Sequence, residues 1–380
     1  MKTIVLSGGH LSPAVAVAQE LKKRNYNVVI FGRAYAFSEA KNKPSLEKEM
    51  FEEMSVDFQP VDIARVPHSI LAFPGYMISF VQSTYSLIKS LQRIKPQAVM
   101  SFGGYVGIPL LTAAVLLRIP IFIHEQTTIA GKNNAFFSYF AQKVFTSWTE
   151  TVKSFPNATR NKILLTGNPI RSEILSIKPK SKQKKNITVY ITGGSTGSHA
   201  INIVVADCLE KLLKKYTIIH QAGDSHFNDF DLLSEKRNTL PKELQKRYQL
   251  ARYINLSEVT KVYSECNIVV GRSGANTVTE VALLGKPAIF IPLPLAQYNE
   301  QELLSRKLND QGVAVIINQK DLTGEALLSA LENIARNYET YVDNGKTYRE
   351  SEEITRHKDS SRRIIDSIES YSDHRRNSTP

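Results

Sequence analysis

The sequence predicts an α/β protein with two doubly wound domains, each built on a parallel sheet covered by helices on both faces. Three observations indicate this class. Short apolar runs alternate with helical patterns along most of the 380 residues. A glycine-rich turn follows the first strand of each half, at residues 7–10 and 193–197. The length suits two domains of ordinary size, which we expect to face each other across a cleft.

In the first half, strands are expected at short apolar runs bounded by turn residues. These runs are residues 3–6, 28–31, 58–61, 98–102, 121–124, 143–146 and 163–166. Helices are expected where apolar residues recur three or four positions apart. These segments are residues 13–23, 73–94, 109–117 and 133–140. Residues 35–55 are polar and give no clear pattern.

The second half repeats the scheme. Its strands are expected at residues 188–192, near Ile218, and at residues 250–254, 268–270, 288–291 and 313–316. A helix is expected at residues 200–214, and a last helical stretch at about 350–371 should pack back on the first domain. We therefore expect an N-terminal domain over residues 1–166, a C-terminal domain over residues 167–345, and a polar, disordered tail over residues 372–380.

Composition limits the function classes. No run reaches the ~20 apolar residues of a membrane span, and residues 1–6 enter a strand pattern without a signal peptide. The two cysteines, Cys208 and Cys266, lie in apolar patterns and suggest buried thiols of a cytosolic protein. The net charge of +12 favours an anionic membrane surface or a diphosphate ligand. Nucleic acid is not expected as a partner because no nucleic-acid-binding motif accompanies the charge.

Ligands of open parallel sheets bind at the carboxyl ends of the strands. Neither glycine-rich turn has the spacing of a dinucleotide fingerprint or of an NTPase phosphate loop. Residues 271–280, which join an apolar strand to a helix, are the most informative segment. The first turn of a helix offers free N–H groups to a phosphate, and Glu280 could accept bonds from sugar hydroxyls. The alternative is a capping box formed by Thr277 and Glu280, with no ligand.

Three further residues are candidates at strand ends or joints. His10 follows the first strand and could act as a general base, or it could be a turn histidine bonded to backbone. Arg171, at the joint between the domains, could bind two phosphate oxygens or stabilise the hinge through an ion pair. Ser195 could donate to a phosphate or simply cap a helix.

Other segments carry weaker signals. Residues 124–126 are polar and end a strand, but their spacing defines no catalytic arrangement. Asp229 and Asp231 are expected in a solvated loop rather than at a metal site. The helix at residues 73–94, with apolar residues just before it and Lys89 and Arg93 near its end, is either a core helix or a membrane-facing surface.

A set of short motifs runs in order along about residues 3–320: residues 8–10 with Pro13, 102–106, 123–126, 167–171, 193–197, 272–280 and 292–294, and Gln301. This ordered set is specific, and it resembles the bacterial MurG-type glycosyltransferases. The family transfers N-acetylglucosamine from UDP to the lipid-linked muramoyl-pentapeptide of peptidoglycan synthesis.

The resemblance implies a GT-B fold with two Rossmann-like domains, an inverting mechanism and site residues that transfer motif by motif. His10 would be the catalytic base, and no metal or cofactor is expected. Glu280 would bind the ribose hydroxyls, and Leu256 would lie near the uracil. The other implied substrate-binding residues are Ser7, Gly8 and Gly9 at the diphosphates, Tyr105 and Thr127 in the first domain, and Arg171, Ser195, Ala275, Asn276, Thr277, Val278, Thr279 and Gln301 around the UDP-sugar.

The implied reaction moves N-acetylglucosamine from UDP-GlcNAc to the C4 hydroxyl of undecaprenyl-diphosphate-linked muramoyl-pentapeptide. The implied location is the cytoplasmic face of the cell membrane, on the anionic inner-membrane surface. This chain departs from the family in four places. Its first turn is short, and Thr127 stands at the usual asparagine. Residues 298–301 read Tyr-Asn-Glu-Gln where the family has Asp-(Asp/Asn)-His-Gln, and Leu304 replaces a later asparagine. Alternatives are a related transferase with a glycolipid acceptor, a UDP-sugar epimerase, and a non-catalytic relative.

Overall fold

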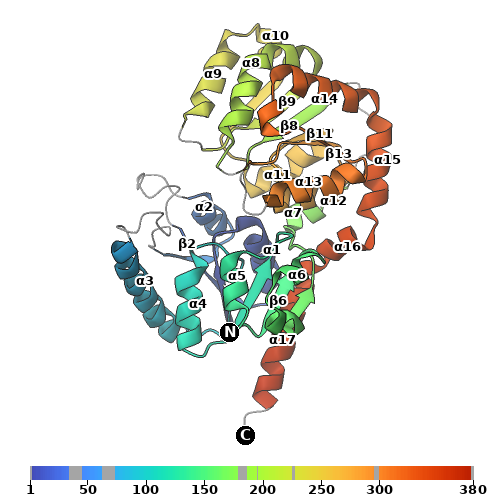
Figure 1. The fold of residues 1–380 in the computed structure, drawn as a ribbon. Coiled ribbons are helices and arrows are strands. Elements are labelled where there is room, and N and C mark those ends of the chain that lie inside the picture. The colour runs from blue at the N-terminus through green and yellow to red at the C-terminus, as the bar shows by residue number, and fades with distance from the viewer. Residues whose placement is uncertain are drawn as a thin grey trace. The chain divides into compact units, whose positions relative to one another are not determined.

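The computed structural model describes residues 2–33, 45–61, 73–178, 186–194, 196–224, 227–294 and 299–377. The chain forms two compact units (Figure 1). Unit 1 comprises Met1–Ser172 and Arg356–Pro380, and unit 2 comprises Glu173–Thr355. Ser195, the lysine-rich residues 179–185 and the apolar residues 70–72 lie outside the described residues.

Unit 1 holds a seven-stranded parallel sheet in the order β3-β2-β1-β4-β5-β6-β7. The side chains of the central strands are buried, as expected for a sheet that helices cover on both faces. The strands are β1 (Thr3–Ser7), β2 (Asn27–Gly32), β3 (Asp57–Pro60), β4 (Ala98–Ser101), β5 (Ile121–Glu125), β6 (Lys143–Thr146) and β7 (Ile163–Leu165).

The helices of unit 1 come mostly from the first half of the chain, and the last two return to it from the C-terminus (Figure 1). Helix α17 packs against α1, and Arg24 of unit 1 bonds to Glu369 at 2.7 Å. The helices are α1 (Leu11–Lys23), α2 (Leu46–Glu53), α3 (Phe73–Ile94), α4 (Gly107–Leu116), α5 (Lys132–Phe137), α6 (Thr151–Ser154), η2 (Asn157–Lys162), α16 (Glu352–Lys358, which straddles the boundary) and α17 (Ser360–Asn377).

Unit 2 holds a six-stranded parallel sheet in the order β10-β9-β8-β11-β12-β13. Its strands are β8 (Thr188–Thr192), β9 (Thr217–Gln221), β10 (Tyr248–Ala251), β11 (Ile268–Gly271), β12 (Ala288–Phe290) and β13 (Ala314–Ile316). Its helical elements are α7 (Ser172–Leu175), α8 (His199–Lys215), α9 (Asp229–Thr239), α10 (Lys242–Gln245), α11 (Leu256–Glu265), α12 (Ala275–Leu284), α13 (Glu300–Asp310), η4 (Gln319–Asp321), α14 (Gly324–Arg336) and α15 (Tyr338–Arg349).

Both sheets reverse their strand order at the strand that precedes a glycine-rich turn. In unit 1 the chain passes outward from β1 to β2 and β3 and then returns to β4 on the other side of β1. In unit 2, β8 has the same place between β9 and β11. Such reversals leave a crevice at the carboxyl ends of the central strands, where ligands of doubly wound sheets bind. The topology thus places both predicted turns at ligand-binding positions.

The boundary between the units differs from the predicted one. Residues 167–172 belong to unit 1 because their backbone is bonded to residues of that unit. Gly167 O accepts bonds from His124 Nε2 at 3.1 Å and Ser360 Oγ at 2.6 Å. Asn168 N donates to His357 Nδ1 at 2.6 Å. Arg171 therefore lies on the N-terminal side, whereas the sequence placed it in the second domain.

Three other local expectations differ from the structure. The last helix continues to Asn377, where a disordered tail was expected from residue 372, because no glycine or proline interrupts it. Strand β10 ends at Ala251 rather than at residue 254. Asp229 is 1% exposed at the start of α9 instead of lying in a solvated loop, because Asn202 Nδ2 donates to its Oδ2 at 2.9 Å and His199 Nδ1 lies 2.6 Å from its Oδ1.

Candidate functional site

The first turn of unit 1 is tightly bonded within the protein. Ser7 is fully buried, and its Oγ lies 3.1 Å from Ser101 Oγ and accepts from Phe102 N at 3.2 Å. Gly8 N donates to Phe31 O at 2.6 Å. Gly9 N donates to Glu47 Oε1 at 2.9 Å. The groups that were expected to meet a diphosphate are thus engaged by protein atoms.

His10 lies at the N-cap of α1 and is half-buried. Within the described residues, its side chain makes no capping hydrogen bond to the first turn of α1. Burial lowers the pKa of His10, and the nearby charge of Glu125 opposes part of that shift. A histidine kept neutral in this way can accept a proton from a hydroxyl.

Glu125 ends β5, two strands away from β1, and is 5% exposed. Its Oε1 accepts from Thr127 N at 3.1 Å, and its Oε2 accepts from Gly131 N and Asn134 Nδ2, both at 2.9 Å. These bonds fix the carboxylate within electrostatic reach of His10. The hydroxyl of Thr127 is also used internally, 2.8 Å from Glu125 Oε1.

The turn after β4 approaches the turn after β1. Gly9 has a φ of +106°, and a Cβ built on it would lie 3.1 Å from Gly103 O. Gly104, with a φ of +77°, also lies beside this turn, since a Cβ there would be 3.7 Å from Gly9 Cα. Tyr105 follows directly and is partly exposed. The structure therefore gathers His10, Tyr105, Glu125 and Thr127 at the ends of β1, β4 and β5.

In unit 2, the informative segment after β11 folds as a strand, a short turn and a helix. The N-cap of α12 is Gly274, so the predicted capping box of Thr277 and Glu280 does not form. The side chains of Ala275, Val278 and Thr279 are buried, and Thr279 Oγ1 donates to Ala275 O at 2.7 Å. The helix dipole and the first-turn amides make this end of α12 suited to an anion.

Glu280 is 4% exposed and is held by α11. The hydroxyl of Tyr263 donates to Glu280 Oε2 at 2.9 Å, and the Tyr263 ring meets the ring of Tyr190 edge-on at 5.5 Å. Tyr190 donates to Gln221 Oε1 at 3.2 Å, and Gln221 Nε2 donates to Gly194 O at 3.1 Å. A continuous chain of contacts thus joins Glu280 to the glycine-rich turn after β8.

Comparison with known proteins decides the family. Residues 4–146 match the glycosyltransferase family 28 N-terminal domain, and residues 188–363 match the glycosyltransferase family 28 C-terminal domain. The chain is 31% identical to the UDP-N-acetylglucosamine--N-acetylmuramyl-(pentapeptide) pyrophosphoryl-undecaprenol N-acetylglucosamine transferase of Bacillus licheniformis, over 88% of this chain and 89% of that protein. The protein of the same name from Rickettsia canadensis is 31% identical over 90% of this chain and 93% of its own length.

The chain belongs to glycosyltransferase family 28.

A solved structure supports the same assignment. The crystal structure of Acinetobacter baumannii MurG matches with a TM-score of 0.67 and 28% identity, over 97% of this chain and 100% of that one. The predicted MurG-type resemblance and GT-B fold are confirmed, and the chain is a glycosyltransferase. Its family 28 domains carry the two sets of residues described above, one set in each unit.

The remaining predicted family 28 site residues lie as follows. Arg171 is 8% exposed and lies one residue before the end of unit 1. Leu256 is buried at the start of α11, where Asn255 and Glu258 form a capping box. Gln301 Oε1 accepts from Leu293 N at 3.0 Å. Asn276 and Thr277 are partly exposed in the first turn of α12.

Sequence reasoning did not assign roles to Glu125, Tyr263 or Ser273. The charge of Glu125 acts on the pKa of His10 because the sheet order brings β5 near β1. Ser273 is fully buried before α12, and its Oγ has no hydrogen-bond partner among the described residues. The sequence signal that could have identified Ser273 was its position inside the motif at residues 272–280, between Arg272 and Gly274. Arg272 itself is structural: it donates to Ile291 O at 3.0 Å, and burial lowers its pKa to about 10.

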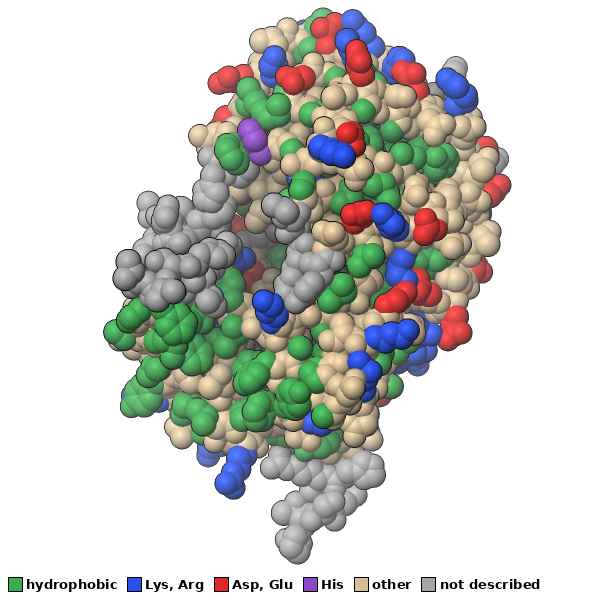
Figure 2. Space-filling view, in the orientation of Figure 1, with side chains coloured by type: hydrophobic (Ala, Val, Ile, Leu, Met, Phe, Trp, Pro, Cys, Tyr) green, Lys and Arg blue, Asp and Glu red, His purple; other side chains and the backbone are tan. Residues whose placement is uncertain are grey.

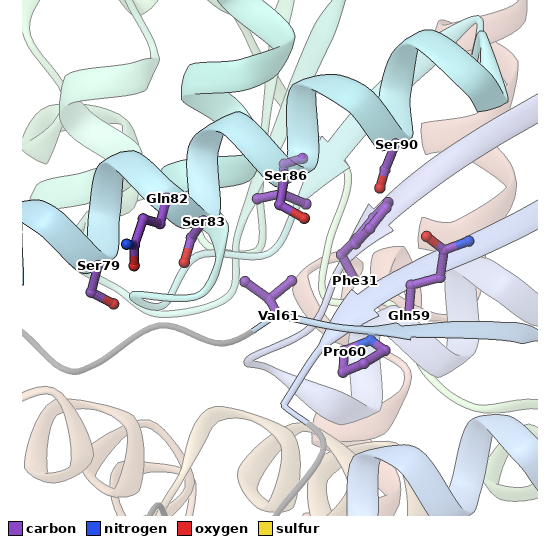
Figure 3. Close-up of a pocket in the computed structure, with 10 residues that line it drawn as sticks. Phe31, Gln59, Pro60, Val61, Ser79, Gln82, Ser83, Ser86 and Ser90 are labelled. Carbon is purple, nitrogen blue, oxygen red and sulfur yellow. The ribbon is translucent and has the colours of Figure 1, made fainter.

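A pocket of about 510 Å³ lies elsewhere in unit 1, between α3 and the ends of β2 and β3 (Figure 3). Ser79, Ser83 and Ser86 project toward it from one face of α3. Its lining contains no charged side chain and none of the predicted site residues, so it does not suit a diphosphate. The lining residues are Phe31, Gln59, Pro60, Val61, Ser79, Gln82, Ser83, Ser86, Leu87 and Ser90.

Helix α3 has one side in the core of unit 1 and another side on its surface. Leu87 and Leu91 are buried on one side. On another side Ile78, Val81 and Tyr85 are each about three-fifths exposed (62%, 59% and 59%). Figure 2 shows hydrophobic side chains gathered over this helix. Among the described helices, none is both long and apolar enough to cross a bilayer.

Two further observations concern side-chain clusters and thiols. Cys208 and Cys266 are buried and form no disulfide with each other, as expected. In the described part of the chain, no group of three or more His, Cys, Asp or Glu side chains has the arrangement of a metal site.

Proposed function

We propose that this glycosyltransferase moves N-acetylglucosamine from UDP-GlcNAc to the C4 hydroxyl of undecaprenyl-diphosphate-linked muramoyl-pentapeptide, with inversion at the anomeric carbon. The relatives' names supply the donor and acceptor. The observation that carries the chemistry is His10: a partly exposed histidine with a lowered pKa, no competing hydrogen bond among the described residues, and a carboxylate nearby.

The proposed reaction begins with proton transfer. His10, or a water that it orders, takes the proton of the acceptor hydroxyl. The resulting oxygen attacks the anomeric carbon from the side opposite to UDP, forming the new glycosidic bond while the bond to the diphosphate breaks. The charge of Glu125 stabilises the imidazolium that forms, as its opposing effect on the pKa of His10 indicates. Inversion follows from the single displacement.

UDP is proposed to bind at the carboxyl edge of the unit 2 sheet. The first turn of α12 would hold the diphosphate through the amides of Ala275, Asn276 and Thr277, and the helix dipole would stabilise the charge that grows there. Glu280, oriented by Tyr263, would accept bonds from the ribose hydroxyls. The other donor contacts proposed in unit 2 are Ser195, Leu256, Val278, Thr279 and Gln301, with Val278 and Thr279 acting through backbone because their side chains are buried.

We propose that the protein docks on the anionic inner face of the cell membrane through α3. Its exposed apolar side chains would enter the interface, as in amphipathic surface helices. Lys89 lies beside them, with its Nζ 4.4 Å from the Tyr85 ring centroid, and Arg93 is in the last turn. A cation next to apolar groups suits a surface of anionic headgroups.

The proposal is tested by offering radiolabelled UDP-GlcNAc to the protein with the lipid-linked muramoyl-pentapeptide. We expect label in the lipid product and release of UDP. UDP-glucose serves as the matched donor control and should give much less product. Absence of labelled lipid with both donors, under conditions in which UDP still binds, would overturn the proposed acceptor.

A further inference from the structure

The carboxylate of Glu47 occupies the first turn of unit 1. Glu47 lies in the first turn of α2 and is 5% exposed. Its Oε1 accepts from Gly9 N at 2.9 Å, and its Oε2 accepts from Arg33 N at 3.2 Å. One side chain therefore joins the turn after β1 to the residue that follows β2.

The helix that carries Glu47 is itself fixed to the end of β2. Ser45 caps α2 by accepting from Lys48 N at 3.1 Å. The hydroxyl of Ser45 also donates to Arg33 O. Both the side chain and the backbone around Glu47 are thus anchored at the same strand end.

The glycines of this region make room for the carboxylate. A Cβ built on Gly8 would lie 1.7 Å from Glu47 Oε1, and one on Gly32 would lie 2.8 Å from Glu47 Cδ. A side chain at either position would displace Glu47. Because the carboxylate fills the space beside Gly8 and takes the N–H of Gly9, a phosphate has neither the room nor the donor that this turn was expected to provide.

The surroundings of Glu47 oppose a second anion there. Burial raises the pKa of the Glu47 carboxyl, whereas the bonds from Gly9 and Arg33 and the charge of Arg33 act in the opposite direction. A phosphate brought beside this carboxylate would meet like charge at short range. The turn is therefore organised around a carboxyl group that belongs to the protein.

The next residue along the turn is His10. Its ring makes no hydrogen bond within the described residues, so its direction depends on the backbone that carries it. That backbone is unusual: Gly9 has a φ of +106°, which favours glycine, and His10 has an extended φ of −118° and ψ of 96° just before α1. The bond from Gly9 N to Glu47 holds the peptide group between Gly8 and Gly9, one residue before His10.

We propose that Glu47 is a positioning residue for His10 and that the first turn orients the base instead of binding the acceptor diphosphate. This inference rests on the proposed function. A base must reach its proton with accurate geometry, so loosening the turn should lower kcat more than it changes substrate binding.

The test compares Glu47→Gln with Glu49→Gln, a control on the exposed face of the same helix. The glutamine is isosteric, but its amide NH₂ opposes one of the two backbone N–H groups. We expect kcat to fall by about tenfold or more, with KM for both UDP-GlcNAc and the lipid acceptor changed by less than about twofold. Glu49→Gln should match the wild type in all three constants.

A double-mutant cycle with His10→Ala separates positioning from general support of the fold. If Glu47 acts through His10, Glu47→Gln should cause no further loss in the His10→Ala background. An equal further loss in that background would overturn the inference, and so would an unchanged kcat in Glu47→Gln. A lower acceptor KM with unchanged kcat in Glu47→Gln would also overturn it. That result would mean that the Glu47 carboxylate competes with the acceptor diphosphate for the first turn.

Two measurements keep the outcome clear. The thermal midpoint and UDP binding of each variant report whether it folds. If Glu47→Gln does not fold, Glu47→Asp serves as the second variant. The shorter carboxylate keeps the charge but not the reach, so we expect it to lower kcat as well. A wild-type protein that labels no lipid would refute the proposed function, whereas an active wild type with an equally active Glu47→Gln variant would refute only the role of Glu47.

Discussion

Tyr263 donates a 2.9 Å hydrogen bond to Glu280 Oε2, and both side chains are buried in unit 2. The bond joins α11 to α12 across residues that are 17 positions apart. It fixes one oxygen of the carboxylate that we assign to the ribose. A rigid carboxylate binds two neighbouring hydroxyls with less loss of side-chain entropy than a mobile one.

Replacing Tyr263 with Phe should weaken donor binding. The variant keeps the ring contact with Tyr190 and removes only the hydroxyl, a net loss of about 1 kcal/mol. We expect KM for UDP-GlcNAc to rise about fivefold, with kcat nearly unchanged. Steady-state kinetics at fixed acceptor concentration measure both constants. A large fall in kcat with no change in KM would contradict the assignment of Glu280 to the ribose.

His10→Ala should reduce transfer to a small residual rate and leave UDP binding intact. General bases contribute about 10²- to 10⁴-fold to rate, and the ring makes no bond within the described residues that the fold would lose. In the wild type, activity should fall on the acid side as His10 takes up a proton, at a pH below the ordinary histidine value because its pKa is lowered. Transfer by the variant at near wild-type rate would show that His10 is not the base.

Stability should fall as the pH is lowered below about 6.5, the ordinary pKa of histidine. Burial lowers the pKa of His124 to about 4 and of His220 to about 3. Between the ordinary value and these lowered values, the unfolded chain binds protons at histidines that stay neutral in the folded chain. As the pH is lowered, each histidine therefore reduces the free energy of unfolding by up to about 1.4 kcal/mol per pH unit, down to about pH 4. Urea unfolding at a series of pH values measures the slope. His220→Gln should flatten it, although His220 also bonds Tyr248 and Asn202.

Val81→Asp should weaken binding to vesicles that contain anionic lipid. Val81 is 59% exposed on α3, so the change places a carboxylate among the proposed membrane-facing groups without disturbing the core. Leu303→Asp, at a 41% exposed position on α13 of unit 2, is the matched control. Co-sedimentation with vesicles should show a several-fold loss for Val81→Asp and none for Leu303→Asp. Equal binding by both variants would exclude α3 as the docking surface.

Local patterns in the sequence were enough to predict the fold class and the order of the elements. Apolar runs such as residues 143–146 and 188–192 coincide with β6 and β8, and residues 73–94 coincide with α3. These patterns are local, since side-chain spacing along a strand or helix is set within a few residues. The glycine-rich turns were also recognisable, because a turn that leads from strand to helix has a local composition.

The groups that the turns contact could not be predicted from local patterns, because they come from distant parts of the chain. Gly9 and Glu47 are 38 residues apart, and Glu47 lies in a segment whose polar sequence gave no clear pattern. The charge of Glu125 affects the pKa of His10 because β4 alone separates β1 from β5 in the sheet. Gly167 joined unit 1 because its carbonyl bonds Ser360, 193 residues away. Hydrogen bonds and burial between distant residues depend on strand order and on close packing, which local spacing does not encode.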